Sequence, residues 1–124
     1  MSELVCLELA VVLWLVHLLL QSGTSRVPLA WNVGPRDEPP PPTSAIGGRA
    51  ARAYRNYMES FPVFAALDLA FIATHHPAGI WPILWIAARI VYAPLYLLGV
   101  SYFRTLVWIV SIVAIVAMLI RLAS

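Results

Sequence analysis

The sequence has no lysine and little charge of either sign. Only 11% of its 124 residues are charged, whereas 61% are hydrophobic. A soluble domain usually has about 25% charged and about 45–50% apolar residues, so this composition excludes an ordinary soluble domain. The chain is also too short for a second domain of typical size. We expect a single membrane domain over residues 1–124.

Every basic residue of the chain is an arginine. The lack of lysine is typical of a GC-rich bacterial genome, and it also suits burial, because a planar guanidinium is less strongly hydrated than an ammonium group. The arginines are Arg26, Arg36, Arg49, Arg52, Arg55, Arg89, Arg104 and Arg121. We therefore expect a bacterial inner-membrane protein with some of these side chains buried.

A single cysteine, Cys6, excludes an internal disulfide and a cysteine-rich metal site. It lies in an apolar run, where a free cysteine usually behaves as a small hydrophobic residue. The adjacent His75 and His76 are a weak metal signal, so we expect no metal. The sequence shows no nucleotide-binding loop, catalytic serine motif or basic nucleic-acid surface, and we expect no nucleic-acid partner.

Long apolar segments predict an all-α, integral membrane four-helix bundle. The first segment nearly spans a hydrocarbon core of about 30 Å at about 1.5 Å per residue. Its start carries Glu3 and no basic residue, which favours a retained helix over a signal peptide. We expect helices at about residues 4–20, 49–74, 81–98 and 103–122.

Residues 21–45 form a different kind of segment, rich in proline and poor in apolar residues. Such a composition favours an extended loop without regular structure. Most of the arginines lie in this loop or at the start of the second helix, and the turn between the second and third helices has none. Positively charged loops tend to face the cytoplasm, so we expect a cytoplasmic first loop and periplasmic termini.

Polar side chains recur at helical spacing inside the second and third segments, which places them along one face of each helix. They are Arg49, Arg52, Asn56 and Glu59 in the second segment, and Arg89, Tyr92 and Tyr96 in the third. An ionisable residue inside a membrane costs about 2.5–3.5 kcal/mol on insertion scales, so each needs a partner or a purpose. Glu59 and Arg89 fall at similar depths, and we expect a buried ion pair between them.

Arg104, at the start of the fourth segment, lies at the cytoplasmic mouth of this polar region. Guanidinium groups, phenols and an amide suit a ligand that bears carboxylates, because arginine offers them paired donors. An arginine there can also stabilise an anion such as a thiolate. The alternative is that these residues only hold the helices together. At the other end of the bundle, we expect a salt-bridge network of Glu8, Asp68 and Arg121.

Two stretches resemble the MAPEG family, the membrane-associated proteins in eicosanoid and glutathione metabolism. The first reads GRAARAYRNYMESFPVF and carries Arg52, Asn56 and Glu59 at the spacing of the family's second-helix signature, before an aromatic–proline pair. The second reads RIVYAPLYLLGVSYFRTLVW and is similar to the third helix and its turn into the fourth, as bacterial members have it. The likeness extends to the four-helix layout and covers most of the chain.

The resemblance implies a homotrimer that binds glutathione between neighbouring subunits, near the cytoplasmic face. By motif position, Arg104 would be the catalytic arginine that stabilises the thiolate. The motif residues that would hold the tripeptide are Arg52, Asn56, Glu59, Tyr92 and Tyr96, and we add Arg89 because it shares the face of Tyr92. Family members use glutathione for transfer to lipophilic electrophiles, for peroxide reduction or for isomerisation of lipid peroxides.

We therefore expect a glutathione-dependent membrane transferase or peroxidase acting on lipophilic electrophiles or peroxides, with glutathione as co-substrate. The lipophilic small-molecule substrate would arrive from the membrane lipid. Two alternatives stay open. Small four-helix transporters of similar length carry a glutamate in the first helix, as Glu8 does here. The chain could also be a MAPEG-fold scaffold without catalytic activity, since a retained fold does not guarantee retained chemistry.

Overall fold

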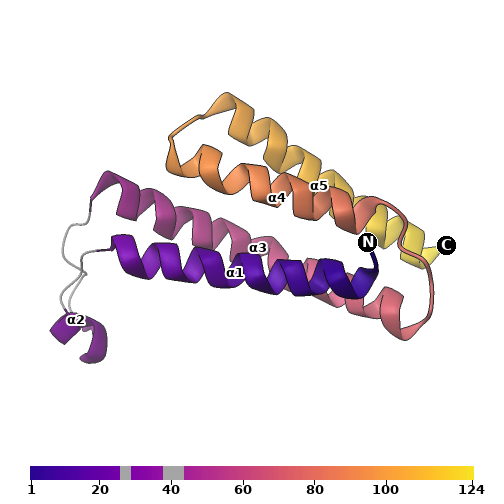
Figure 1. Cartoon of the computed structure of the whole chain (residues 1–124), viewed down its shortest axis with the longest axis horizontal. Helices are drawn as coiled ribbons and strands as arrows, with labels where there is room; N and C mark the ends of the chain where they lie inside the picture. Colours follow the sequence, from indigo (N-terminus) through magenta and orange to yellow (C-terminus); the bar gives the residue numbers. More distant parts are fainter. Residues whose placement is uncertain (26–28, 38–43) are drawn as a thin grey trace.

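The computed structural model describes residues 1–25, 29–37 and 44–124, and these residues form helices and their connections. The long helices are α1 (Glu3–Thr24), α3 (Ala45–Ala73), α4 (Trp81–Leu97) and α5 (Tyr102–Ala123). A short helix, α2 (Leu29–Val33), lies in the connection between α1 and α3 (Figure 1). The all-α fold predicted from the sequence is confirmed over the described residues.

The long helices pack most closely as two pairs, α1 with α3 and α4 with α5 (Figure 1). Contacts of α3 with α4 and α5, and of α1 with α4, join the two pairs. Both termini and the α3–α4 connection lie at one end of the bundle in Figure 1. The start of α3, the α4–α5 turn and α2 lie at the other end.

Two of the helices, α1 and α5, are long and apolar enough to cross a membrane, with 22 residues each. At the usual rise per residue each spans about 33 Å, close to the hydrocarbon thickness of about 30 Å. Their outer surfaces carry exposed apolar side chains such as Val12, Leu19, Leu106 and Ile120. Because a soluble monomer rarely exposes such large apolar surfaces, these faces suit a lipid environment.

Every third or fourth residue of α3 is buried, which defines the stripe that faces the bundle: Ala53, Tyr57, Ser60, Phe64, Asp68 and Phe71. Phe64 stacks on Trp85 of α4 with ring centroids 4.0 Å apart. Tyr57 donates a hydrogen bond to the Ala10 carbonyl of α1. This buried stripe fixes which face of α3 turns toward the other helices and which turns away.

At the end with the termini, two side chains tie the α3–α4 turn to the outer helices. The Glu3 carboxylate accepts a hydrogen bond from the Ala78 N–H at 3.0 Å. The Arg121 Nε donates to the Pro77 carbonyl at 2.7 Å. The turn is therefore held from α1 on one side and from α5 on the other.

The salt-bridge network predicted for this end is wrong. Glu8 is exposed on α1, and Arg121 binds a backbone carbonyl instead of a carboxylate. Asp68 is fully buried, and neither of its oxygens has a hydrogen-bond partner among the described residues. Similar depth along the bundle did not bring these side chains together, because Asp68 lies in the interior whereas Glu8 is exposed on the surface of α1.

The segment 21–45 differs from the extended loop that its composition predicts. The first helix continues to Thr24, α2 covers Leu29–Val33, and α3 begins at Ala45. The Ser44 side chain accepts a hydrogen bond from the Gly47 N–H at 3.1 Å and so caps α3. This cap satisfies an N–H group that has no partner within the helix and explains the early start of α3. The proline run 39–42 and Arg26 lie outside the described residues.

Candidate functional site

The polar faces of α3 and α4 meet at Asn56 and Arg89. Arg89 Nη1 donates a hydrogen bond to Asn56 Oδ1 at 2.9 Å. The Arg89 side chain is 0% exposed. Its Cζ lies 5.3 Å from the Tyr57 ring centroid and 4.4 Å from that of Tyr92. A guanidinium is attracted to an aromatic face by the ring quadrupole, so Arg89 is held by two rings and one amide.

The predicted ion pair between Glu59 and Arg89 is not formed. Glu59 is exposed, whereas Arg89 binds the neighbouring turn of α3 through Asn56. On a helical wheel of about 100° per residue, Asn56 lies about 80° from the centre of the buried stripe and Glu59 about 140° from it. The three-residue step therefore turns Glu59 off the surface that faces α4.

Aromatic and cationic groups continue from Arg89 toward the α4–α5 turn. The rings of Tyr92 and Tyr96 lie 5.6 Å apart between centroids. The Arg104 Cζ lies 4.6 Å from the Tyr96 ring centroid. Tyr96 belongs to the last turn of α4 and Arg104 to the first turn of α5, so the short turn between these helices brings them together.

A cavity of about 240 Å³ opens beside this row of side chains. It is lined by Asn56, Tyr92, Tyr96, Arg104, Thr105 and Trp108. We call it the α4–α5 cavity. The structure thus brings four of the predicted site residues around one space and places Arg89 behind Asn56, away from the lining.

The lining residues Thr105 and Trp108 were not predicted from the sequence. They follow Arg104 by one and four residues on α5, and Trp108 is 37% exposed. Residues four apart share a helix face, so the position of Trp108 relative to Arg104 was the available signal. For Thr105 the sequence offers no comparable signal.

Arg52 and Glu59 lie outside the lining of the α4–α5 cavity. Both side chains are exposed, and neither has a hydrogen-bond or ion-pair partner in the part of the chain that the structure describes. The Arg52 guanidinium folds back over Gly48, where an added Cβ would lie 3.2 Å from Nη1. Within one chain, Arg52 and Glu59 therefore do not contribute to the α4–α5 cavity that the other predicted site residues line.

The α4–α5 cavity is lined mainly by hydrogen-bond donors. Arg104 has only donors, the indole of Trp108 is a donor, and the phenols of Tyr92 and Tyr96 can donate. The six described lining residues include no carboxylate. Such a set of groups favours an anion, and paired arginine donors favour a carboxylate in particular.

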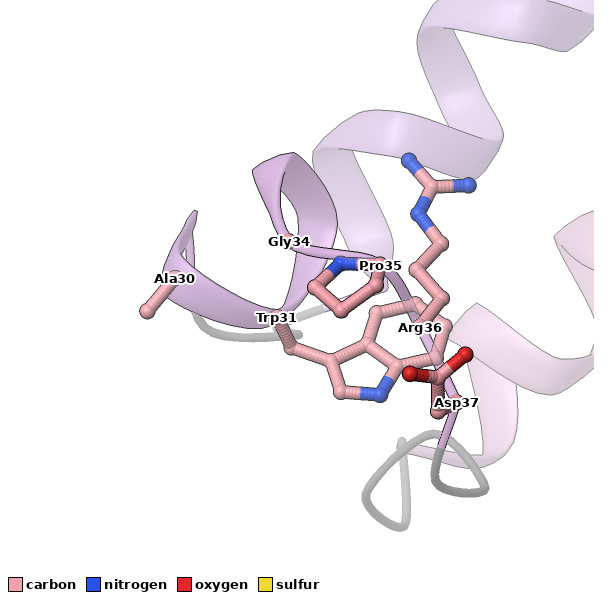
Figure 2. A pocket seen from close by; sticks show the side chains of 6 residues that line it. All are labelled: Ala30, Trp31, Gly34, Pro35, Arg36 and Asp37. Carbon is pink, nitrogen blue, oxygen red and sulfur yellow. The ribbon is translucent and has the colours of Figure 1, made fainter.

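A second hollow, of about 270 Å³, lies beside α2 and contains none of the predicted site residues. Figure 2 shows the Arg36 guanidinium turned away from the Asp37 carboxylate. Arg36 donates from Nε and Nη2 to the Asn32 carbonyl at 2.9 and 2.8 Å, and its Cζ lies 5.3 Å from the Trp31 ring centroid. Its cation is engaged locally, which makes this hollow a weaker anion site than the α4–α5 cavity.

Comparison with known protein families identifies the fold. The sequence model of the MAPEG family matches residues 4–124, essentially the whole chain. No curated protein matches the chain. MAPEG proteins are membrane helical bundles, in agreement with the apolar helices α1 and α5, so this is an integral membrane protein. The resemblance seen in the two sequence stretches is confirmed, and the chain belongs to the MAPEG family.

Proposed function

We propose that this protein is a glutathione-dependent transferase or peroxidase that acts on lipophilic electrophiles or peroxides. The observation that carries the proposal is the donor-lined α4–α5 cavity, where Asn56, Tyr92, Tyr96 and Arg104 converge. Membership of the MAPEG family supports glutathione as the co-substrate, because the family includes glutathione-dependent transferases and peroxidases.

Glutathione has the chemistry that this cavity favours. Its carboxylates would accept hydrogen bonds from the Asn56 amide and from the phenols of Tyr92 and Tyr96, which leaves the Arg104 guanidinium for the thiol. The ring of Tyr96 under the Arg104 guanidinium restricts the rotation of that side chain. A donor that is already oriented loses less conformational entropy when the ligand binds.

In this proposal, Arg104 stabilises the thiolate of bound glutathione. A positive charge within a few ångströms favours the ionised thiol, and the attraction is stronger beside lipid than in water because the effective dielectric constant is lower. The thiolate sulfur would attack an electrophilic carbon and form a thioether while the leaving group departs. The thiolate, not the thiol, is the nucleophile in such a reaction.

With a hydroperoxide, the thiolate sulfur would attack the O–O bond and leave the alcohol as the reduced product. The resulting sulfenic acid of glutathione would react with a second glutathione, which yields the disulfide and water. The exposed Trp108, which lines the cavity, would give an apolar substrate a lateral route from the bilayer.

We further propose that the active form is a homotrimer in which a neighbouring copy completes the site. Glu59 is the middle residue of α3, yet it is exposed, as is Arg52. A charge in contact with lipid at such a depth costs about 2.5–3.5 kcal/mol on insertion scales. A second copy covering this face of α3 would remove that cost and would give both side chains a place at the ligand. The number of three subunits follows from the family resemblance.

The arginine distribution supports a cytoplasmic position for the α4–α5 cavity, in the inner membrane of a bacterium. Arg49, Arg52 and Arg104 lie toward the end of the bundle that holds α2 and the α4–α5 turn. Short loops rich in arginine tend to stay in the cytoplasm. Both termini would then face the periplasm.

Activity assays on the purified, detergent-solubilised protein test the proposal. The assays would combine glutathione with a chlorinated dinitroarene in one series and with a lipid hydroperoxide in another. We expect saturable turnover with at least one substrate class and a loss of about 10²–10³ in kcat/KM for Arg104→Ala, the usual effect of removing a charge-stabilising donor. Arg121→Ala is the matched control, since this arginine lies at the opposite end of α5. Absence of turnover with both classes in folded protein would contradict the proposal and favour a scaffold role.

A further inference from the structure

Asn56 lies between the buried Arg89 side chain and the α4–α5 cavity. On one side its Oδ1 accepts the hydrogen bond from Arg89 Nη1, and on the other side the residue lines the α4–α5 cavity. A guanidinium has donors and no acceptor, so the Asn56 amide can meet it only through the carbonyl oxygen. The NH₂ group of Asn56 is therefore left for the cavity.

The interior of the bundle holds Arg89 in place. Its guanidinium lies against the rings of Tyr57 and Tyr92. Tyr57 is itself fixed by its hydrogen bond to the Ala10 carbonyl and by stacking on His17 at 4.7 Å between centroids. Arg89 Nε and Nη2 have no hydrogen-bond partner among the described residues, which leaves the Asn56 oxygen as the acceptor that holds the guanidinium.

The orientation of the Asn56 amide decides the polarity of one wall of the cavity. With the NH₂ group inward, the wall donates to a carboxylate. With the amide reversed, an oxygen would face the ligand and repel a carboxylate. The reversed orientation would also place the NH₂ group against the buried Arg89 cation, where two donors would meet without an acceptor.

We propose that Arg89 is a positioning residue that locks the Asn56 amide with its NH₂ group toward the cavity, which makes this wall selective for a carboxylate. The identity of the ligand as glutathione rests on the proposed function. The orientation of Asn56 does not, because it follows from the contacts of Arg89. Arg89 acts through Asn56 and does not touch the ligand.

The mobility of the Asn56 side-chain amide tests the proposal without any ligand. Asparagine occurs only at positions 32 and 56, so ¹⁵N-asparagine labelling gives two side-chain NH₂ signals, and Asn32→Ser assigns them. We expect a rigid Asn56 amide in the unmodified protein, with a high heteronuclear NOE, and a mobile amide in Arg89→Met. Arg89→Lys keeps a donor for Asn56 and should retain part of the rigidity. An equally rigid amide in Arg89→Met would overturn the proposal.

Glutathione titrations of the same proteins test the consequence for binding. Asn56→Ala and Arg89→Met should each weaken binding by about tenfold, the usual effect of one lost hydrogen bond to a charged group. The double variant should bind no more weakly than the weaker single variant, because both changes remove one interaction. Asn56→Asp keeps an acceptor for Arg89 but turns an oxygen to the cavity, so it should weaken binding more than Asn56→Ala.

The titrations distinguish failure of the positioning role of Arg89 from failure of the proposed function. Fully additive losses in the double variant would show that Arg89 acts independently of Asn56, which would overturn the positioning role. No glutathione binding by the unmodified protein would contradict the proposed function instead. In that case the NMR comparison of Arg89→Met with the unmodified protein still decides whether Arg89 positions the amide.

Discussion

Individual arginines of this protein contact different partners. These contacts explain why the residues are arginines and not lysines. Arg89 and Arg104 lie over tyrosine rings, whereas Arg49 and Arg121 donate to backbone carbonyls. A planar guanidinium can stack on a ring and still use its N–H groups, which an ammonium group does less well. The absence of lysine is therefore consistent with the contacts, as well as with genome composition.

The first prediction concerns the shape of the cation at position 104. Arg104→Lys keeps the positive charge but loses the planar stack on Tyr96 and the paired donors. We expect its kcat/KM to lie between those of the unmodified protein and Arg104→Ala. The kcat/KM measured with glutathione as the varied substrate checks this. A lysine variant with full activity would show that charge alone suffices at this position.

The second prediction concerns Asp68, which is fully buried with no hydrogen-bond partner for either oxygen among the described residues. A buried ionisable group without a partner is costly, and the neutral amide of asparagine has nearly the same shape. We expect Asp68→Asn to unfold at the same temperature as the unmodified protein or at a higher one, by circular dichroism in detergent. A loss of stability of more than about 1 kcal/mol would indicate a partner for the carboxyl group.

Several site residues could be predicted from the sequence, because helical spacing places Tyr92 and Tyr96 on one face of α4 whatever the tertiary packing. Helical spacing alone could not decide whether Glu59 forms an ion pair with Arg89. Whether Asn56 or Glu59 faces α4 depends on the rotation of α3 about its axis, which is set by the packing of Tyr57 and its neighbours in the core. Spacing gives a shared face, and packing decides where that face points.

At the scale of secondary-structure elements, the end of α4 is stabilised by a residue of α3. Arg49 Nη1 donates to the Leu97 carbonyl at 3.3 Å, in the last turn of α4. The last carbonyls of a helix have no partner within it, and a cation there interacts favourably with the helix dipole. Gly99 follows with a φ of 76°. This arrangement holds the α4–α5 turn from which Arg104 extends.

The third prediction concerns this turn. Gly99→Ala should lower the free energy of unfolding by about 1–2 kcal/mol, because alanine is strained at positive φ. The added Cβ would also lie 3.1 Å from the Arg49 guanidinium. Thermal unfolding measures the change. Gly23→Ala is the control, since a Cβ there has nothing within 4 Å, and it should be neutral or stabilising. Equal stabilities of the two variants would contradict the role given to the turn.

The helix boundaries show which local features of the sequence predict where a helix begins or ends. The composition of residues 21–45 predicted an irregular loop, and it gave no sign of α2. A signal for the early start of α3 was present in Ser44, since serine is a preferred N-cap residue. Glycines at positions 47 and 48 weaken that signal, because glycine is a poor helix former.

At the scale of the whole molecule, the single chain leaves one polar face of α3 uncovered and several apolar faces exposed. The apolar faces of α1 and α5 suit lipid. The face of α3 with Arg52 and Glu59 does not suit lipid, because a charged side chain in contact with hydrocarbon is energetically unfavourable. In the proposed assembly, a neighbouring copy would cover this face of α3, and lipid would cover the apolar faces of α1 and α5.

The fourth prediction follows from this division of surfaces. Native mass spectrometry of the protein in mild detergent should show a particle of about 41 kDa, three times the chain mass of 13.7 kDa. Arg52→Ala with Glu59→Ala should weaken the assembly, because the proposal places both side chains at the contact with the neighbouring copy. A monomer at micromolar concentration in the unmodified protein would contradict the trimer.

The central claim is that glutathione is ionised beside Arg104 in the α4–α5 cavity. The most direct measurement titrates the solubilised protein with glutathione and follows thiolate absorbance by ultraviolet difference spectroscopy. We predict a saturable thiolate signal for the unmodified protein and for Arg121→Ala, and its disappearance in Arg104→Ala. No thiolate signal from folded unmodified protein, or the same signal in Arg104→Ala, would contradict the claim.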